Sequence, residues 1–282
     1  MLTPENLLVL ATHGTYSYPE LLRPYLHPKF DQRLQRNFSD VGTSVLVKGI
    51  NPDQCLVPEH GRIAGDPARA EDAKDLFRMH DFGGVQVYNG LLPDSVRNAC
   101  LDASHRPYHA EITRQILAVR GDTRNLLVIF DIHDTGNLIL AVDPSNDRHR
   151  AERRSHPEIT MDDGWHMPPV IISDNDGKTA PSQLMQDLAN AFRTEFRLGD
   201  GDVRTNWHFK GGHVTKTYGD PAIPALAAAQ QGRAVVQVEL GRYLYIDERS
   251  QEIVPCAAKF FGERLATVLA EVAGGYTHRA KP

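Results

Sequence analysis

Residues 126–133 read Leu-Leu-Val-Ile-Phe-Asp-Ile-His, an apolar run that carries two polar side chains near its end. Its length and β-branched content suit a strand buried on both faces of a sheet. The runs at 7–11 (Leu-Leu-Val-Leu-Ala) and 234–240 (Ala-Val-Val-Gln-Val-Glu-Leu) have a similar character. We therefore expect three buried, parallel strands at the centre of the fold.

Helical patterns lie between and after these strands. Apolar residues recur at helical spacing behind Pro107, behind Ser182 and between residues 257 and 272. Pro107 suits a first helical position, Ser182 suits a cap, and Gly199 suits the end of the second helix. The short run at 170–173 predicts one further strand. Helices alternating with strands indicate an α/β fold, here a three-layer sandwich with a mixed, mostly parallel central sheet.

The length and composition of the chain indicate how large a core it can bury and how many domains it forms. It has 282 residues, of which 41% are hydrophobic and 24% charged, so it can bury a large core without a cofactor. No loop marks a domain boundary, and we expect one domain over residues 1–282. The loop at 144–169 is long enough to be an insertion that shapes a site.

The charge of the chain narrows its partners. A net charge of −5 argues against nucleic acid and against an anionic membrane surface, and favours a small-molecule substrate. A local basic run lacks interleaved aromatic residues that could stack on bases, so a solvated loop is the better interpretation. This run contains Arg148, Arg150, Arg153 and Arg154.

Cysteine usage and the first residues predict a cytoplasmic location. Cys55, Cys100 and Cys256 are odd in number and form no CxxC pair, which is typical of reduced, mostly buried thiols. The apolar run at 7–11 is too short for a signal or a membrane segment, and no basic stretch precedes it.

Polar residues follow or interrupt the first two apolar runs. His13 comes directly after the first run, where it fits a structural hydrogen bond or a ligand role. Asp131 and His133 are two residues apart in a strand, so both point to one face. That pair suits a metal ligand with its supporting carboxylate, or equally a buried Asp–His hydrogen bond. Because ligands bind beyond the carboxyl ends of strands in α/β sheets, one shared site is indicated.

The third run contains a carboxylate that would be costly to bury alone. Glu239 lies among apolar residues, with Gln237 on the same face and Arg242 just beyond. A buried ion pair between Glu239 and Arg242 is one interpretation. The other is a general base that takes a proton from water.

Several common motifs are missing from the sequence. It has no GxGxxG after a strand, no GxxxxGK[ST], no GxSxG and no HExxH, which weakens the dinucleotide, P-loop, serine-hydrolase and helical-zinc interpretations. His105 and His109 have the spacing of a helical metal site, but Pro107 lies between them and suits the start of the helix. A polar helix entry is the better interpretation of this pair.

Taken in order, several segments resemble the N-formylglutamate amidohydrolases, which are similar to zinc exopeptidases and aspartoacylases. In the first half the resemblance rests on His13-Gly14 with Tyr18-Pro19, on Asp40, on Arg62-x-x-x-Asp66-x-x-Arg69 and on Asp131-x-His133. In the second half it rests on 206–212 (Asn-Trp-His-Phe-Lys-Gly-Gly), 217–219 and 237–245. Together these segments span most of the chain, and their joint occurrence is more specific than any one motif.

The resemblance implies a zinc-exopeptidase-like fold and a zinc-dependent hydrolase. The expected reaction is hydrolysis of N-formyl-L-glutamate to formate and glutamate by a zinc-activated water, with Glu239 as general base. The expected zinc ligands are His13, His133 and Asp40. Asp131 and Gln237 are expected to support the ligands and the base. The residues expected to bind substrate or to form the cleft wall are Arg62, Arg69, Arg242, Gly211 and Gly212.

Three departures from the family pattern affect substrate preference. Ala68 stands where the family has Asn, which removes an amide that would help to hold a substrate carboxylate. Thr12 replaces Pro, and Asp134 replaces Ser. These differences keep two alternatives open: a carboxypeptidase-like or other N-acyl amino acid deacylase, and a non-catalytic protein that binds small anions.

Overall fold

The computed structural model describes residues 4–119, 125–136, 167–226, 229 and 232–277. A six-stranded sheet with the order β2-β1-β3-β6-β4-β5 forms its centre. Its strands are β1 (Leu7–Leu10), β2 (Cys55–Leu56), β3 (Leu127–Thr135), β4 (Val170–Ser173), β5 (Val203–Thr205) and β6 (Arg233–Gly241). A separate hairpin joins β7 (Ile246–Asp247) to β8 (Glu252–Ile253).

The three predicted central strands are present, and they are parallel to one another. β3 pairs with β1 on one side and with β6 on the other, with His133 opposite Glu239. β3 continues to Thr135, so Asp131 and His133 lie within the strand. The strand at 170–173 is also confirmed, and it runs antiparallel to β6. The sheet is therefore mixed and mostly parallel, as the sequence predicts.

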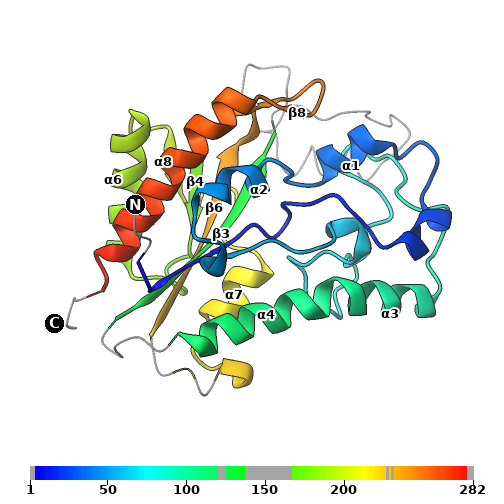
Figure 1. The fold of residues 1–282 in the computed structure, drawn as a ribbon, viewed down its shortest axis with the longest axis horizontal. Helices are drawn as coiled ribbons and strands as arrows, with labels where there is room; N and C mark the ends of the chain where they lie inside the picture. The colour runs from blue at the N-terminus through cyan, green and yellow to red at the C-terminus, as the bar shows by residue number, and fades with distance from the viewer. Residues whose placement is uncertain (1–3, 120–124, 137–166, 227–228, 230–231, 278–282) are drawn as a thin grey trace.

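Helices cover both faces of this sheet (Figure 1). Along β1, Leu7 and Val9 join a core with α2 (Thr43–Leu46), α6 (Ser182–Phe196) and α8 (Pro255–Gly274). Leu8 and Leu10 join a second core with α4 (His105–Ala118) and α7 (His213–Gly219). This alternation follows from the two-residue period of a strand. The predicted three-layer α/β sandwich is confirmed.

Three helix boundaries differ from the sequence prediction. α4 begins at His105, so Pro107 lies inside its first turn, where its missing N–H costs no helical hydrogen bond. Ser182 is the first residue of α6 and makes no capping hydrogen bond, because Pro181 holds the cap position. Arg197, and not Gly199, adopts the left-handed conformation that ends this helix.

The segment between β1 and α4 contains short elements and its own small core. Its elements are η1 (Glu20–Tyr25), α1 (Gln32–Phe38), α2, η2 (Val47–Gly49), η3 (Pro52–Gln54), β2, η4 (Arg62–Ala64) and α3 (Asp94–Ala103). Leu22, Phe38, Ile63, Tyr88 and Leu101 are among the residues of this core. Short 3-10 helices also occur later in the chain, at η6 (Pro224–Leu226) and η7 (Arg242–Leu244).

The remaining sequence expectations have different outcomes. No helix among the described residues is both long and apolar enough to cross a membrane. All three cysteines are free, but Cys256 is exposed rather than buried. The basic run at 148–154 and residues 144–166 of the long loop lie outside the described residues. The cytoplasmic location and the single domain over 1–282 stay predictions.

Candidate active site

The central strands bring the polar residues of the sequence motifs to one face of the sheet. On β3, the apolar residues on either side of Asp131 belong to the core under α2, α6 and α8. Asp131 and His133 therefore point to the opposite face, toward α4 and α7. The same alternation on β6 places Gln237 and Glu239 on that face. His13 follows β1, whose register with β3 pairs Leu10 with Asp131.

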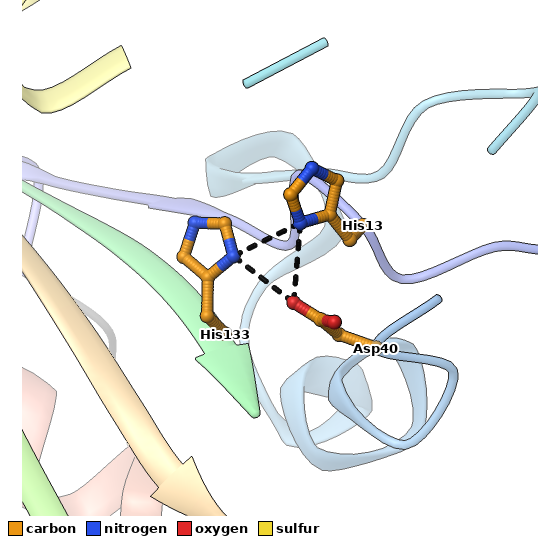
Figure 2. A group of neighbouring side chains, drawn as sticks. All are labelled: His13, Asp40 and His133. Carbon is orange, nitrogen blue, oxygen red and sulfur yellow. Dashed lines mark hydrogen bonds and ion pairs between the residues drawn. The ribbon is translucent and has the colours of Figure 1, made fainter. Parts of the chain in front are cut away.

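His13, Asp40 and His133 converge on one point, as Figure 2 shows. The Nδ1 atoms of the two histidines are 3.2 Å apart. Asp40 Oδ2 lies 3.2 Å from His13 Nδ1 and 3.0 Å from His133 Nδ1. Asp40 comes from the turn between α1 and α2, and its backbone N–H donates to the carbonyl of His13. All three side chains are buried.

This cluster fits a divalent metal ion. Two imidazole nitrogens and a carboxylate oxygen that lie within 4.8 Å of one another form the three-ligand donor set of a catalytic zinc site. Burial raises the pKa of Asp40, but the charges of His13 and Arg62 outweigh burial and hold this pKa well below its usual range. Asp40 is therefore ionised, and the cluster attracts a cation.

Arg62 shows that a positive charge suits the centre of the cluster. Its Nη2 atom contacts His13 Nδ1 and lies 3.4 Å from Asp40 Oδ1. The lone pair of His13 Nδ1 serves either this guanidinium or a metal ion, because one lone pair has one partner at a time. The guanidinium also lies over the rings of Phe38 and Phe82, and Arg62 is 8% exposed.

Each histidine of the cluster has a carboxylate close to its Nε2 atom. His133 Nε2 lies 2.9 Å from Asp131 Oδ2, and His13 Nε2 lies 2.7 Å from Asp66 Oδ1. Burial lowers the pKa of His133, but Asp131, Asp40 and Glu239 together outweigh burial, so this pKa is well above its usual value. A carboxylate in this position fixes the ring orientation of a metal ligand and raises its basicity. This role was predicted from the sequence for Asp131 but not for Asp66.

Glu239 is held by hydrogen bonds on the strand next to His133. Thr135 Oγ1 donates to Glu239 Oε2 over 2.7 Å, and Gln237 Nε2 donates to Glu239 Oε1 over 2.6 Å. Burial raises the pKa of Glu239, and His133 offsets only part of this rise. The carboxylate is therefore a stronger base than an exposed glutamate. The other end of Gln237 accepts a hydrogen bond from the backbone N–H of Gly212.

Gly211 and Gly212 lie in the loop that precedes α7. Gly211 has a φ of 102°, a conformation that a side chain would strain. Gly212 is the residue before α7, and through Gln237 it links this loop to Glu239. The two glycines thus belong to a bend beside the candidate base.

The predicted substrate arginines differ in their surroundings. Arg62 adjoins the histidine cluster, while Arg69 is half-buried and pairs with Asp75 at 3.0 Å. Arg242 is enclosed: it donates to Asp134, to Gln251 and to the backbone carbonyls of Asn37 and Ser39. Its carboxylate partners are therefore Asp134 and, at 3.6 Å, Asp40, and not Glu239. This geometry favours a structural role for Arg242, one that holds the turn before Asp40.

His105 and His109 hold the segment that carries Asp66 and Arg69. Their rings lie on one face of α4 with centroids 4.4 Å apart. His105 Nε2 lies 2.9 Å from the carbonyl oxygen of Arg69, and His109 Nε2 lies 3.0 Å from that of Pro67. These contacts agree with a polar role at the helix entry. No sequence motif indicated that their partners would be backbone carbonyls on either side of Ala68.

The fold and the buried cluster define an α/β protein with a candidate metal site. The sequence matches the family model described as N-formylglutamate amidohydrolase over residues 5–246. The chain therefore belongs to the N-formylglutamate amidohydrolase family. This membership supports an amidohydrolase activity on a small molecule. The search of curated proteins found no match.

Solved structures show the same fold. One is an N-formylglutamate amidohydrolase from Ralstonia eutropha JMP134, with a TM-score of 0.70 at 18% identity, covering 96% of this chain and 93% of that one. Another is a gene product of Agrobacterium tumefaciens, with a TM-score of 0.58 at 15% identity, covering 97% of this chain and 92% of that one. At these identities the likeness concerns the fold.

Proposed function

We propose that the protein is a zinc-dependent amidohydrolase that cleaves N-formyl-L-glutamate to formate and glutamate. One observation carries the proposal: the ligand atoms of His13, Asp40 and His133 converge within 4.8 Å, and Glu239 lies opposite His133 on the next strand. His13, Asp40 and His133 would hold the ion. When bound, a zinc ion supplies Lewis acidity that lowers the pKa of water and polarises the amide carbonyl.

Glu239 is the proposed general base. Its carboxylate takes a proton from the attacking water as the new carbon–oxygen bond forms, and gives this proton to the amine nitrogen as the carbon–nitrogen bond breaks. Thr135 and Gln237 hold both carboxylate oxygens, so the base needs little reorganisation during the reaction. Asp66 and Asp131 keep the histidine rings oriented through their Nε2 atoms.

Arg62 and Arg69 are the proposed contacts for substrate carboxylates. A planar guanidinium binds a carboxylate through two parallel hydrogen bonds. Arg62 adjoins the ligand cluster, so an anion bound there lies close to the reacting amide. Arg242 has no part in this proposal, because its donors already serve protein acceptors.

Metal analysis combined with one substitution tests the proposal. Protein purified without chelator should contain one zinc per chain and release formate from N-formyl-L-glutamate. Glu239→Gln should lower kcat by about 10²- to 10⁴-fold while zinc content and substrate binding stay unchanged. Full activity in Glu239→Gln would refute the general-base assignment. Metal-free protein that binds the substrate without turnover would instead indicate a non-catalytic anion-binding protein.

Ala68 favours a second candidate, the deacylation of another N-acyl amino acid. Its buried methyl group cannot make a hydrogen bond, and its backbone N–H already donates a hydrogen bond to Asp66. Rates on N-formyl-, N-acetyl- and peptidyl-glutamate separate the candidates. A preference for the formyl group supports the first, and a preference for either of the others supports the second.

A further inference from the structure

Three guanidinium groups gather beside the ligand cluster. Arg62 and Arg78 both lie over the ring of Phe82, at 5.2 and 5.4 Å from its centroid. Arg69 and Arg78 both approach the same oxygen of Asp75, at 3.0 and 3.5 Å. Arg78 therefore joins Arg62 to Arg69 in one arginine cluster (Arg62, Arg69 and Arg78). None of the sequence motifs contains Arg78.

The guanidinium groups of the arginine cluster repel one another, and the carboxylates of Asp66 and Asp75 offset this repulsion at Arg78 only in part. Burial and the charges of Arg62 and Arg69 lower the pKa of Arg78. Asp75 is shared between two of the guanidinium groups and is half-exposed, so it offsets only part of their repulsion. Like charges placed together in a partly buried site destabilise the protein unless an anion joins them.

Unused donors point to the same conclusion. Among the residues that the structure describes, the buried Nε atoms of Arg62 and Arg78 have no hydrogen-bond partner. A buried donor without an acceptor costs free energy, and the cost is larger for a charged group. Arg62 also places one end of the cluster against His13 and Asp40, next to the reacting centre of the proposed function.

We propose that Arg78 is a specificity-determining residue that binds the side-chain carboxylate of the substrate and selects acyl derivatives of acidic amino acids. This inference rests on the proposed function, since it needs the scissile amide at the ligand cluster. Arg62 contacts that cluster directly, and Arg78 shares the ring of Phe82 with Arg62.

Arg78→Gln tests the inference on two substrates of nearly equal shape. N-formyl-L-glutamate and N-formyl-L-glutamine differ in the charge of the side chain. The loss of a charge-assisted hydrogen bond should lower kcat/KM for the glutamate derivative by roughly 10- to 100-fold, mainly through KM. The value for the glutamine derivative should change by less than about 3-fold. Arg78→Lys keeps the charge and should restore part of the preference.

Arg97→Gln is the matched control, because Arg97 also stacks on a phenylalanine, Phe77, at 5.2 Å, but is exposed on α3. It should leave both kcat/KM values unchanged. An equal loss on both substrates in Arg78→Gln would mean that Arg78 only supports the 75–82 segment, and would overturn the inference. The proposed function would survive that result, provided that the wild type hydrolyses N-formyl-L-glutamate.

Calorimetric binding separates the two proposals if the wild type hydrolyses neither compound. Tighter binding of N-formyl-L-glutamate than of N-formyl-L-glutamine, lost in Arg78→Gln, would uphold the assignment of Arg78 while the proposed reaction fails. Equal binding of the two compounds by the wild type would overturn the assignment of Arg78 as well.

Discussion

The strands β1, β3 and β6 and the irregular segment between β1 and α4 hold their functional residues in different ways. On the strands, Asp131, His133 and Glu239 are fixed by register and by apolar neighbours on both faces. In the irregular segment, Asp40 and Asp66 depend on polar contacts from distant parts of the chain. Arg242 holds the turn before Asp40, while His105 and His109 hold the segment after Asp66.

This difference has an energetic consequence. Apolar packing is shared among many residues, so no single substitution removes all of it. A buried polar contact between two segments is made by a few atoms, and the loss of one partner leaves the other unsatisfied. We therefore expect the irregular half of the site to be the more sensitive half, even where the substituted residue touches neither metal nor substrate.

The largest effect is expected from Arg242→Met. Burial raises the pKa of Asp134 to about 6 although Arg242 opposes this rise. Without Arg242, the carbonyls of Asn37 and Ser39 lose a buried donor, and the carboxylate of Asp134 keeps the hydroxyl of Tyr245 but loses its positive partner. The free energy of unfolding should fall by about 3–5 kcal/mol, and zinc affinity should fall with it. Urea unfolding and competition with a zinc chelator measure the two effects.

The double variant Arg242→Met/Asp134→Asn is the control for that experiment. It removes both charges, so it should recover part of the lost stability but little of the zinc affinity, because the turn before Asp40 stays unsupported. Unchanged zinc affinity in the single variant would contradict the view that Arg242 positions Asp40.

A smaller effect is expected from the two carboxylates behind the histidines. Asp66→Asn and Asp131→Asn each weaken the orientation of one ligand, and each should lower zinc affinity by about 10- to 100-fold. Asp66→Asn should be the more severe, because the Asp66 carboxylate also interacts with the charges of Arg62 and Arg69, and a neutral amide would not. Chelator competition gives both values, with exposed Asp53→Asn as the control. A larger loss in Asp131→Asn would reverse the comparison.

The smallest effect concerns pH and His109. Burial, with a contribution from His105, lowers the pKa of His109 from 6.5 to about 4. Because the folded pKa is depressed, stability is complete above pH 6.5 and is lost as the pH falls toward 4. This group should contribute a loss of about 2 kcal/mol between pH 7.5 and 5.

Urea unfolding of the wild type and of His109→Gln at both pH values measures this contribution. Glutamine can still donate to the carbonyl of Pro67, but it does not titrate, so the variant should lose about 2 kcal/mol less than the wild type. The exposed His80→Gln should show the wild-type loss. An equal pH dependence in wild type and His109→Gln would show that His109 is not the titrating group.

The sequence predicted the strand half of the fold well, for a physical reason. A strand that is buried on both faces leaves a continuous apolar run, and a polar residue inside that run stands out. Asp131, His133, Gln237 and Glu239 were all found in this way. Neighbouring side chains two residues apart share a face, so their proximity follows from local order alone.

The irregular half could not be predicted in the same way. Asp40 and Arg62 came from the family resemblance, while the position of Asp66 behind His13 and the gathering of Arg78 with the other arginines were missed. Their contacts join residues far apart in the chain, such as Arg242 and Asn37. The spacing of residues within a helix or strand does not predict contacts of this kind. The contact between Arg242 and Asp134 could not be foreseen either, because Asp134 lies on another strand.

The register between β3 and β6 limits where the chain can accept inserted residues. Adding one residue early in β6 while the pairing is kept would turn Gln237 and Glu239 to the opposite face and bring Val236 and Val238 into their places. Loops between the strands can change length without this penalty. Length variation among related sequences should therefore spare β3 and β6 and accumulate in the connecting loops.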